Sequence, residues 1–256
     1  MPLPKALLCP LGDYDALSEE NQLRQAGFAT AVLHWKDLVN QNNDWMQLSG
    51  VLDDPAVHAW VIAGSPAEFT DEVLCRLTLL ALSLRRQGQP GTAFVLNGDG
   101  PAPALPPVLS HAGVWRSGEP FAARLMAARF RPAASLRLPF HVRTLLSPLV
   151  GLWLEIAPAE GRMAGFTVGV LDADMNAFGV GPAGSLPTTS RLAYPLLGIR
   201  GTLDDHAFCA CAAQNELSET EACFCKVEGL PQGVFLGDYL TEAGTEEVVP
   251  LMFLGR

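Results

Sequence analysis

Residues 58–88 constrain the fold of this chain more than any other stretch of its sequence. Residues 59–63 (AWVIA) are a short apolar run with strand-forming side chains, which is typical of a buried strand. Ser65 then stands before Pro66, with Glu68 three positions after the serine, and this is the pattern of a capping box with proline at the first helical position. The stretch therefore predicts a strand, a sharp turn and a helix.

The predicted helix is apolar on most of its sides. Apolar side chains recur at helical spacing from Phe69 to Leu84, basic Arg85 and Arg86 follow, and Gly88 is suited to the C-terminal cap. Such a helix is expected to be covered by a sheet on one side and by another domain or subunit on the other.

The serine of this turn also stands where a nucleophile elbow would place its catalytic residue. Residues 63–67 (AGSPA) have small side chains on both sides of Ser65. However, the residue after such a nucleophile donates its backbone N–H to the oxyanion hole, and Pro66 has no N–H. The sequence therefore favours a helix-capping role for Ser65.

The first 115 residues alternate between short strand patterns and helix patterns. Strands are expected at 5–11, 30–35, 59–63 and 92–96, with a helix at 18–25 and the long helix described above. Because strands that alternate with helices imply a parallel sheet, residues 1–115 are predicted to form a small doubly wound α/β domain, flavodoxin-like or Rossmann-like in layout. The first strand lacks a glycine-rich fingerprint, so dinucleotide binding has no support.

One part of this domain resembles known families. The strand that runs into Ser65-Pro66 and a helix is similar to the middle of TIR-like domains and of nucleoside deoxyribosyltransferase-like proteins. A TIR-like enzyme would carry a glutamate farther along this helix, where this chain has residues 74–78 (LCRLT). The resemblance therefore implies no function for this chain.

Polar side chains follow the predicted strands of this domain at the edge where ligands bind in doubly wound sheets. Polar loops have the same composition in any α/β domain, so a turn and a ligand site are both open interpretations. If the chain is an enzyme, Asp13, Glu68 or Asp99 is its acid or base. The candidate ligand-binding residues are Asp13, Asp15, Ser65, Glu68, Asn97 and Asp99.

A basic segment separates two acidic parts of the chain. The formal net charge is −10, and residues 116–143 carry +5 between −6 on residues 1–115 and −9 on residues 144–256. Residues 116–150 are predicted to form a helical bridge whose arginines either pair with the acidic domains or bind an anionic surface. The overall charge disfavours nucleic-acid binding by the whole molecule.

From residue 151 onwards the sequence pattern is that of an antiparallel β-rich domain, a sandwich or barrel-like fold. Short β-rich runs alternate there with Gly, Pro, Asp and Asn over residues 151–256. The sequence shows no targeting signal and no apolar run of the ~20 residues that a membrane span needs, so we expect a cytoplasmic protein with reduced thiols.

Four of the six cysteines lie within residues 209–225 as two C-x-C pairs, Cys209 with Cys211 and Cys223 with Cys225. If residues 207–213 and 221–227 pair as a hairpin, one register places Cys209 opposite Cys225 and Cys211 opposite Cys223, with all four sulfurs on one face. Three interpretations are open: buried inert thiols, a zinc or iron–sulfur site formed by Cys209, Cys211, Cys223 and Cys225, or cross-strand disulfides or a redox pair.

The sequence thus leaves three functional hypotheses. The first is a non-catalytic two-domain protein that binds a small ligand or assembles with a protein partner or a second copy of itself. The second is an enzyme that acts on a small molecule or nucleotide at the carboxyl edge of the N-terminal sheet. The third is a metal or redox protein based on the cysteine cluster.

Overall fold

The computed structural model describes residues 3–39, 44–84, 91–128, 140–239 and 250–255. The chain divides into two compact units, residues 1–135 and 136–256. None of the described helices is long and apolar enough to cross a membrane.

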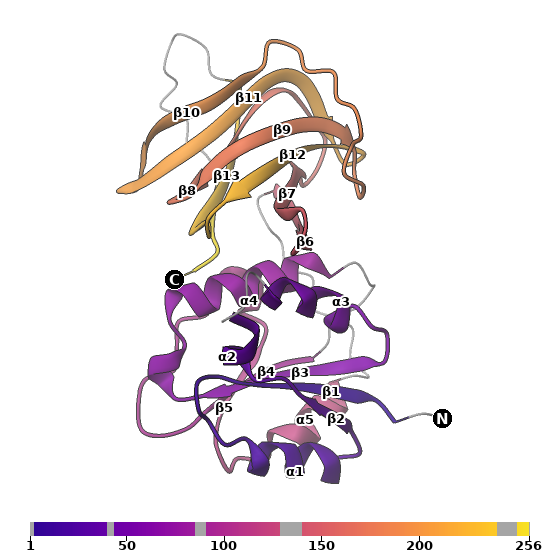
Figure 1. Cartoon of the computed structure of the whole chain (residues 1–256), viewed down its shortest axis with the longest axis vertical. Coiled ribbons are helices and arrows are strands. Elements are labelled where there is room, and N and C mark those ends of the chain that lie inside the picture. Colours follow the sequence, from indigo (N-terminus) through magenta and orange to yellow (C-terminus); the bar gives the residue numbers. More distant parts are fainter. Residues whose placement is uncertain (1–2, 40–43, 85–90, 129–139, 240–249, 256) are drawn as a thin grey trace. The chain divides into compact units, whose positions relative to one another are not determined.

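The first unit is a five-stranded parallel sheet, sheet A, with helices on both faces. Its strands lie in the order β2-β1-β3-β4-β5, which is one of the two common doubly wound orders. Figure 1 shows α1 and α5 on one face of the sheet and α3 and α4 on the other. The elements are β1 (Lys5–Pro10), α1 (Leu17–Gln25), β2 (Ala29–Val32), α2 (Trp35–Val39), α3 (Leu48–Leu52), β3 (Val57–Gly64), α4 (Asp71–Ser83), β4 (Gly91–Leu96), β5 (Gly113–Arg116) and α5 (Phe121–Ala128), with short 3-10 turns at Asp44–Gln47, Pro66–Glu68 and Pro107–Leu109.

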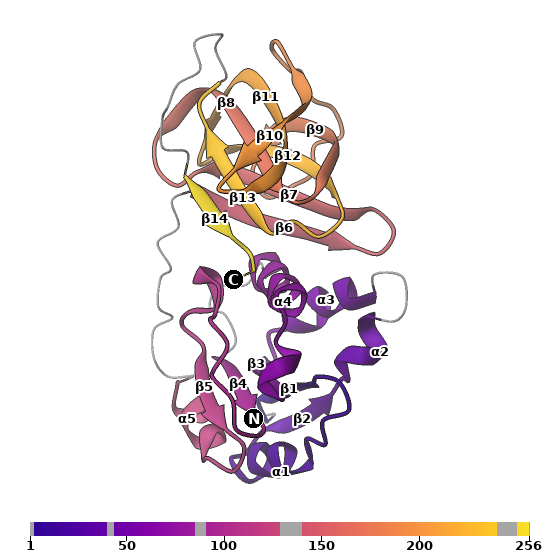
Figure 2. The ribbon, with the colours of Figure 1, turned by 90° about the vertical axis from the view of Figure 1, so that its left-hand side faces the viewer.

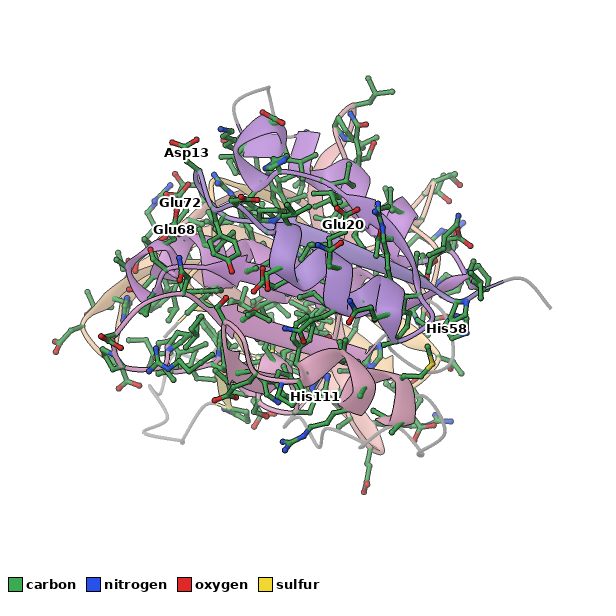
Figure 3. All side chains as sticks on the ribbon, turned by 90° about the horizontal axis from the view of Figure 1, so that it is seen from below. Asp13, Glu20, His58, Glu68, Glu72 and His111 are labelled. Atoms are coloured by element: carbon green, nitrogen blue, oxygen red, sulfur yellow. The ribbon has the colours of Figure 1, made fainter. Side chains whose placement is uncertain are left out.

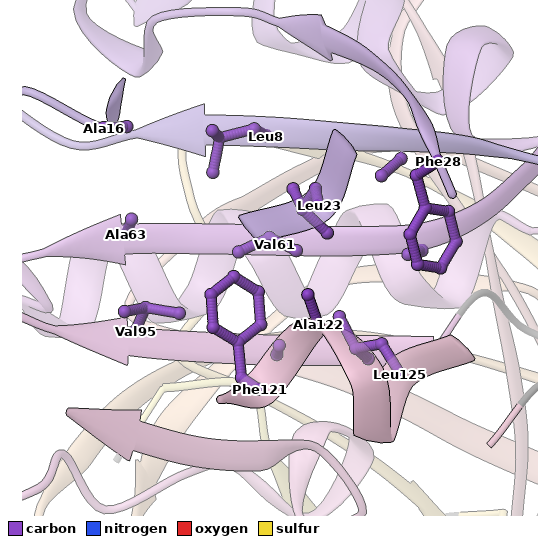
Figure 4. Packing of buried hydrophobic residues seen from close by; sticks show 13 residues of the cluster. Leu8, Ala16, Leu23, Phe28, Val61, Ala63, Val95, Phe121, Ala122 and Leu125 are labelled. Atoms are coloured by element: carbon purple, nitrogen blue, oxygen red, sulfur yellow. The ribbon is translucent and has the colours of Figure 1, made fainter. Parts of the chain in front are cut away.

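The α1 and α5 face of sheet A carries a continuous apolar core. Leu8, Val61 and Val95 project from β1, β3 and β4 towards Leu23 of α1 and Phe121 of α5 (Figure 4). Burial of side chains of this size stabilises the unit by roughly 1.5–3 kcal/mol each. The alternating strands and helices of the sequence therefore form the predicted α/β fold.

The turn after β3 differs from the sequence prediction in one respect. The Ser65-to-Glu68 capping box forms, but it closes only the 3-10 turn at Pro66–Glu68. The long helix, α4, begins at Asp71, and the hydroxyl oxygen of Thr70 accepts a 3.3 Å hydrogen bond from the backbone N–H of Val73. The predicted features at residues 85–88 lie outside the described residues.

Strand β5 was not predicted from the sequence. It has only four residues, none of them fully buried, and its sequence (GVWR) lacks the apolar run that marks the other strands. It pairs in parallel with β4, from Ala93 opposite Gly113 to Leu96 opposite Arg116.

The second unit consists of two antiparallel sheets that pack face to face (Figure 2). Sheet B has the order β6-β7-β12-β9, and sheet C has the order β10-β11-β8-β13-β14. The predicted antiparallel β-rich domain is therefore present. The strands are β6 (Phe140–Ser147), β7 (Gly151–Pro158), β8 (Arg162–Leu171), β9 (Asp174–Pro182), β10 (Leu196–Leu203), β11 (His206–Ser218), β12 (Glu221–Glu228), β13 (Gly233–Gly237) and β14 (Leu251–Phe253).

The segment predicted as a basic helical bridge, residues 116–150, is divided between the two units. Its helix, α5, packs on sheet A, whereas residues 140–147 form β6 and pair with β7. The part at 129–139, with its three arginines, lies outside the described residues. Along β6, Phe140, Val142 and Thr144 are buried, whereas the residues between them are exposed or half-buried. This period of two is typical of a strand, and the sequence analysis did not predict one here.

The hairpin considered for the cysteine cluster does not form. Cys209 and Cys211 lie on β11 in sheet C, whereas Cys223 and Cys225 lie on β12 in sheet B. The ladder partners of Cys211 are Val168 and Leu197, so no cysteine pairs with another along a ladder. The C-x-C spacing correctly predicts a shared face within each strand, but it does not determine which strand lies opposite.

Candidate functional site

The candidate residues of the first unit follow three neighbouring strands of sheet A. Asp13 and Asp15 follow β1, Ser65 and Glu68 follow β3, and Asn97 and Asp99 follow β4. Because β1, β3 and β4 are adjacent and parallel, these loops lie at one edge of the sheet. Figure 3 shows Asp13 and Glu68 on one side of the unit and His58, at the start of β3, on the other.

The three carboxylates considered as an acid or base are engaged locally or exposed. Glu68 Oε2 accepts hydrogen bonds from the Ser65 backbone N–H at 2.7 Å and from its hydroxyl at 2.9 Å. The Asp13 side chain is 93% exposed, and its ion pair with Lys36 lowers its pKa. Asp99 is exposed. The candidate general bases are therefore either exposed, as Asp13 and Asp99 are, or held in a local capping contact, as Glu68 is.

The other three candidates at this edge are Asp15, Asn97 and Ser65, whose contact with Glu68 is described above. They make local contacts in loops or are exposed. Asp15 Oδ1 accepts a 3.1 Å hydrogen bond from the backbone N–H of Leu17, which begins α1. Asn97 is exposed, and its backbone N–H donates to the Gly64 carbonyl oxygen at 2.9 Å. The structure thus brings the six candidates to one edge without joining them into a single cluster of contacting side chains.

A different group of side chains connects two loops at this edge. Glu19 of α1 is fully buried, and its Oε1 accepts a 2.8 Å hydrogen bond from the hydroxyl of Ser117, which follows β5. The Ser117 hydroxyl also lies 3.2 Å from the hydroxyl of Tyr14. Burial raises the pKa of Tyr14 to about 12, and the neighbouring Glu19 contributes to this rise. Glu19 Oε2 is buried and has no hydrogen-bond partner.

The four clustered cysteines meet in the core between sheets B and C. All are buried free thiols, and the side chains of Cys211 and Cys223 are hydrogen-bonded across the two sheets. Burial, followed by the neighbouring thiols, raises the pKa of Cys223, and burial also raises that of Cys225. Across the described ranges, these four thiols included, no three His, Cys, Asp or Glu side chains are grouped so that they could hold a metal ion.

The second unit contains a buried carboxylate that the sequence analysis missed. Glu155 lies in the middle of β7, directly opposite Arg143 of β6. Its side chain is only 1% exposed, and its Oε1 accepts a 2.9 Å hydrogen bond from the backbone N–H of Gly184. Its other oxygen, Oε2, lies 3.9 Å from the Arg143 guanidinium and has no hydrogen-bond partner.

Glu155 lines a cavity of about 310 Å³ on the outer face of sheet B. Pockets for small molecules range from roughly 300 to 1,000 Å³, so the volume suits a small ligand. Partial desolvation lowers the pKa of His141, an exposed residue of β6 that also lines the cavity. The lining residues are His141, Arg143, Glu155, Ala157, Pro158, Ala159, Ala183, Gly184 and Glu219.

The loop after β9 forms one wall of this cavity because it is fastened over the edge of sheet B. The Ser190 hydroxyl oxygen accepts a 2.7 Å hydrogen bond from the Val180 backbone N–H, and the same hydroxyl donates to the Val180 carbonyl oxygen at 3.0 Å. A Cβ at Gly181 would lie 2.8 Å from Pro187, so a glycine there permits the close approach. Gly184, with φ +89°, turns its N–H towards Glu155.

The sequence contained a signal for Glu155 that was overlooked. It is the single charged residue in the apolar run 152–157 (LWLEIA). A lone carboxylate in a strand of this kind is either exposed on the outer face or buried with partners, and both cases differ from an ordinary core position. Its proximity to Arg143 depends on strand pairing, which the sequence analysis did not predict.

Comparison of the chain with models of protein families, with curated proteins and with solved structures finds no match. The candidate sites therefore rest on the sequence and the geometry described above.

Proposed function

We propose that this chain is a non-catalytic binding protein that holds a small molecule in the cavity beside Glu155. One observation carries the proposal: a carboxylate that is 1% exposed leaves Oε2 without a hydrogen-bond partner where it lines a cavity of about 310 Å³. A buried acceptor without a donor costs roughly 1–3 kcal/mol, or more when it is charged. A ligand that supplies the donor would remove this cost on binding.

This proposal moves the ligand from the edge of sheet A to sheet B. It is supported by the engagement of Glu68 with Ser65 and by the exposure of Asp13, since both are less suited to holding a ligand than a shielded carboxylate. An assembly role, a protein partner, a homo-oligomer and a cytoplasmic location remain predictions from the sequence.

Ligand-observed NMR of the full chain with a panel of small cationic, anionic and neutral polar fragments tests the proposal. Ala159 lines the cavity and is exposed, so Ala159→Trp should fill the cavity without disturbing the core. We expect at least one fragment to bind the wild type and to lose binding in this variant. The matched control is Ala207→Trp at an exposed alanine of β11 in the other sheet.

Two results would contradict the proposal. The first is that no fragment of any charge class binds the wild type. The second is that the fragments that bind do so equally well to Ala159→Trp and to Ala207→Trp, because their site is then elsewhere.

An enzyme that acts at the carboxyl edge of sheet A is the second candidate, and Glu19 is the observation that favours it. Its unpartnered Oε2 and the adjacent Tyr14 and Ser117 hydroxyls lie at the edge where doubly wound sheets bind substrates. This candidate predicts that Glu19→Gln abolishes turnover of a substrate while the folded fraction, measured by circular dichroism, stays unchanged.

A further inference from the structure

We propose that the ligand of the Glu155 cavity is a small organic cation with N–H donors, such as an alkylammonium, amidinium or guanidinium group. This inference rests on the proposed function and specifies the chemistry of that same site. The cation would donate an N–H hydrogen bond to Glu155 Oε2.

The arrangement of charges around the cavity favours a cation. Two carboxylates, Glu155 and Glu219, line it together with one guanidinium, that of Arg143. For His141, the other titratable group of the lining, partial desolvation disfavours the protonated form and lowers the pKa, so it does not favour a positive charge here. Counted as formal charges, two carboxylates and one guanidinium leave an excess of one negative charge on the lining.

The position of Arg143 leaves the charge of Glu155 only partly compensated. The 3.9 Å between the guanidinium and Oε2 exceeds hydrogen-bonding distance. Gly184 donates to Oε1, and this neutral donor adds no positive charge. A carboxylate oxygen accepts up to two hydrogen bonds, so the buried Oε2 keeps its full capacity to accept a hydrogen bond.

The remaining walls of the cavity limit the size and character of the cation. Ala157, Pro158, Ala159 and Ala183 present only small apolar side chains. A short alkyl group on the ammonium or guanidinium would contact these walls, whereas the charged end would reach Glu155. A metal ion is disfavoured, since the described residues include no group of three metal-ligating side chains.

Four probes separate charge from hydrogen-bond donation. Methylguanidinium carries both, tetramethylammonium carries charge without N–H, acetamide carries N–H without charge, and acetate carries the opposite charge. The readout is the indole N–H signal of ¹⁵N-labelled Trp153 in the full chain, assigned with Trp153→Phe. Trp153 lies on β7 two residues before Glu155, so the two side chains share one face of sheet B.

We expect methylguanidinium to shift the Trp153 signal saturably, and the other three probes to bind at least about tenfold more weakly. Acetamide forms only a neutral hydrogen bond, which is roughly half as strong as a charge-assisted one. Tetramethylammonium has no N–H to donate, and acetate carries the same charge as the carboxylate. Glu155→Gln should weaken methylguanidinium binding by about tenfold or more. Ala159→Trp, which leaves the carboxylate in place, should also remove binding, so the test does not depend on the Glu155 variant alone.

The failure of this inference differs from the failure of the proposed function. If acetamide, tetramethylammonium or acetate binds the cavity as tightly as methylguanidinium, or if Glu155→Gln binds methylguanidinium normally, the cation is the wrong ligand class although the cavity binds ligands. If neither these probes nor any member of the fragment panel binds in a way that Ala159→Trp removes, the proposed function itself is wrong.

Discussion

Glu19 in the first unit and Glu155 in the second are both almost fully buried carboxylates with one hydrogen-bonded and one unpartnered oxygen. Their surroundings differ. Glu19 receives its hydrogen bond from the Ser117 hydroxyl, beside Tyr14, and so connects the loops that follow β1 and β5. Glu155 receives its bond from a backbone N–H, has an arginine at 3.9 Å and lines a cavity.

The comparison shows that a buried oxygen without a hydrogen-bond partner is compatible with a structural role and with a ligand-binding role. Where its neighbours are hydroxyls that hold two loops together, as at Glu19, the carboxylate is expected to contribute mainly to stability. Where the carboxylate lines a cavity and its arginine lies beyond hydrogen-bonding distance, as at Glu155, a bound ligand is expected to stabilise it more than its protein neighbours do. Three measurements break or sharpen this distinction.

The largest effect is expected from Glu19→Ala, which should lower the free energy of unfolding by about 3 kcal/mol. The substitution removes the acceptor of Ser117 and leaves a small cavity in a fully buried position. Denaturant unfolding in a Trp153→Phe background reports on the first unit, because Trp153 is the only tryptophan of residues 136–256. Glu119→Ala, at an exposed glutamate of the same unit, is the control. A cost equal to that of the control would remove the stability role of Glu19.

A smaller and asymmetric effect is expected at Glu155 and its neighbour. Arg143→Met should cost about 2 kcal/mol, because it leaves a buried charge uncompensated, whereas Glu155→Gln should change stability by less than about 1 kcal/mol. The measurement is denaturant unfolding followed by the Trp153 indole signal. Arg162→Met, whose partner Glu216 is 53% exposed, should cost under about 1 kcal/mol. Equal costs for Arg143→Met and Glu155→Gln would mean that Glu155 has the same structural role as Glu19.

The smallest effect is a pH dependence of the second unit. Partial desolvation lowers the pKa of His141 below its ordinary value of 6.5, so the unfolded chain binds more protons than the folded chain between the two values. Stability should therefore fall as the pH drops below about 6.5 and be insensitive to His141 above it. His141→Gln should flatten the acid side of the curve for the second unit. Partial desolvation also lowers the pKa of His111, so the first unit should keep its own acid dependence when His141 is replaced.

The sequence predicts much of the fold because its local patterns reflect local physics. The alternation of apolar strands with helices anticipates sheet A, and the short β-rich runs after residue 151 anticipate the antiparallel sheets. The predictions that fail depend on which strands become neighbours. Cys211 and Cys223 approach each other across two sheets instead of along one ladder, and the Arg143–Glu155 pairing requires β6, which was not predicted.

The turn between the two cysteine-bearing strands has a consequence for how the second unit acquires its structure. Glu219 and Thr220 lead from β11 in sheet C directly to β12 in sheet B, so the shortest connection of this region forms no hairpin ladder. The ladder partners of β12 lie on β7 and β9, as far back as Leu152 opposite Val227. Chain closure over such separations precedes the gain from pairing, and it slows folding. During synthesis, sheet B therefore remains incomplete until β12 has emerged. Before then, the β6-β7 pair and strand β9 have no strand between them to pair with.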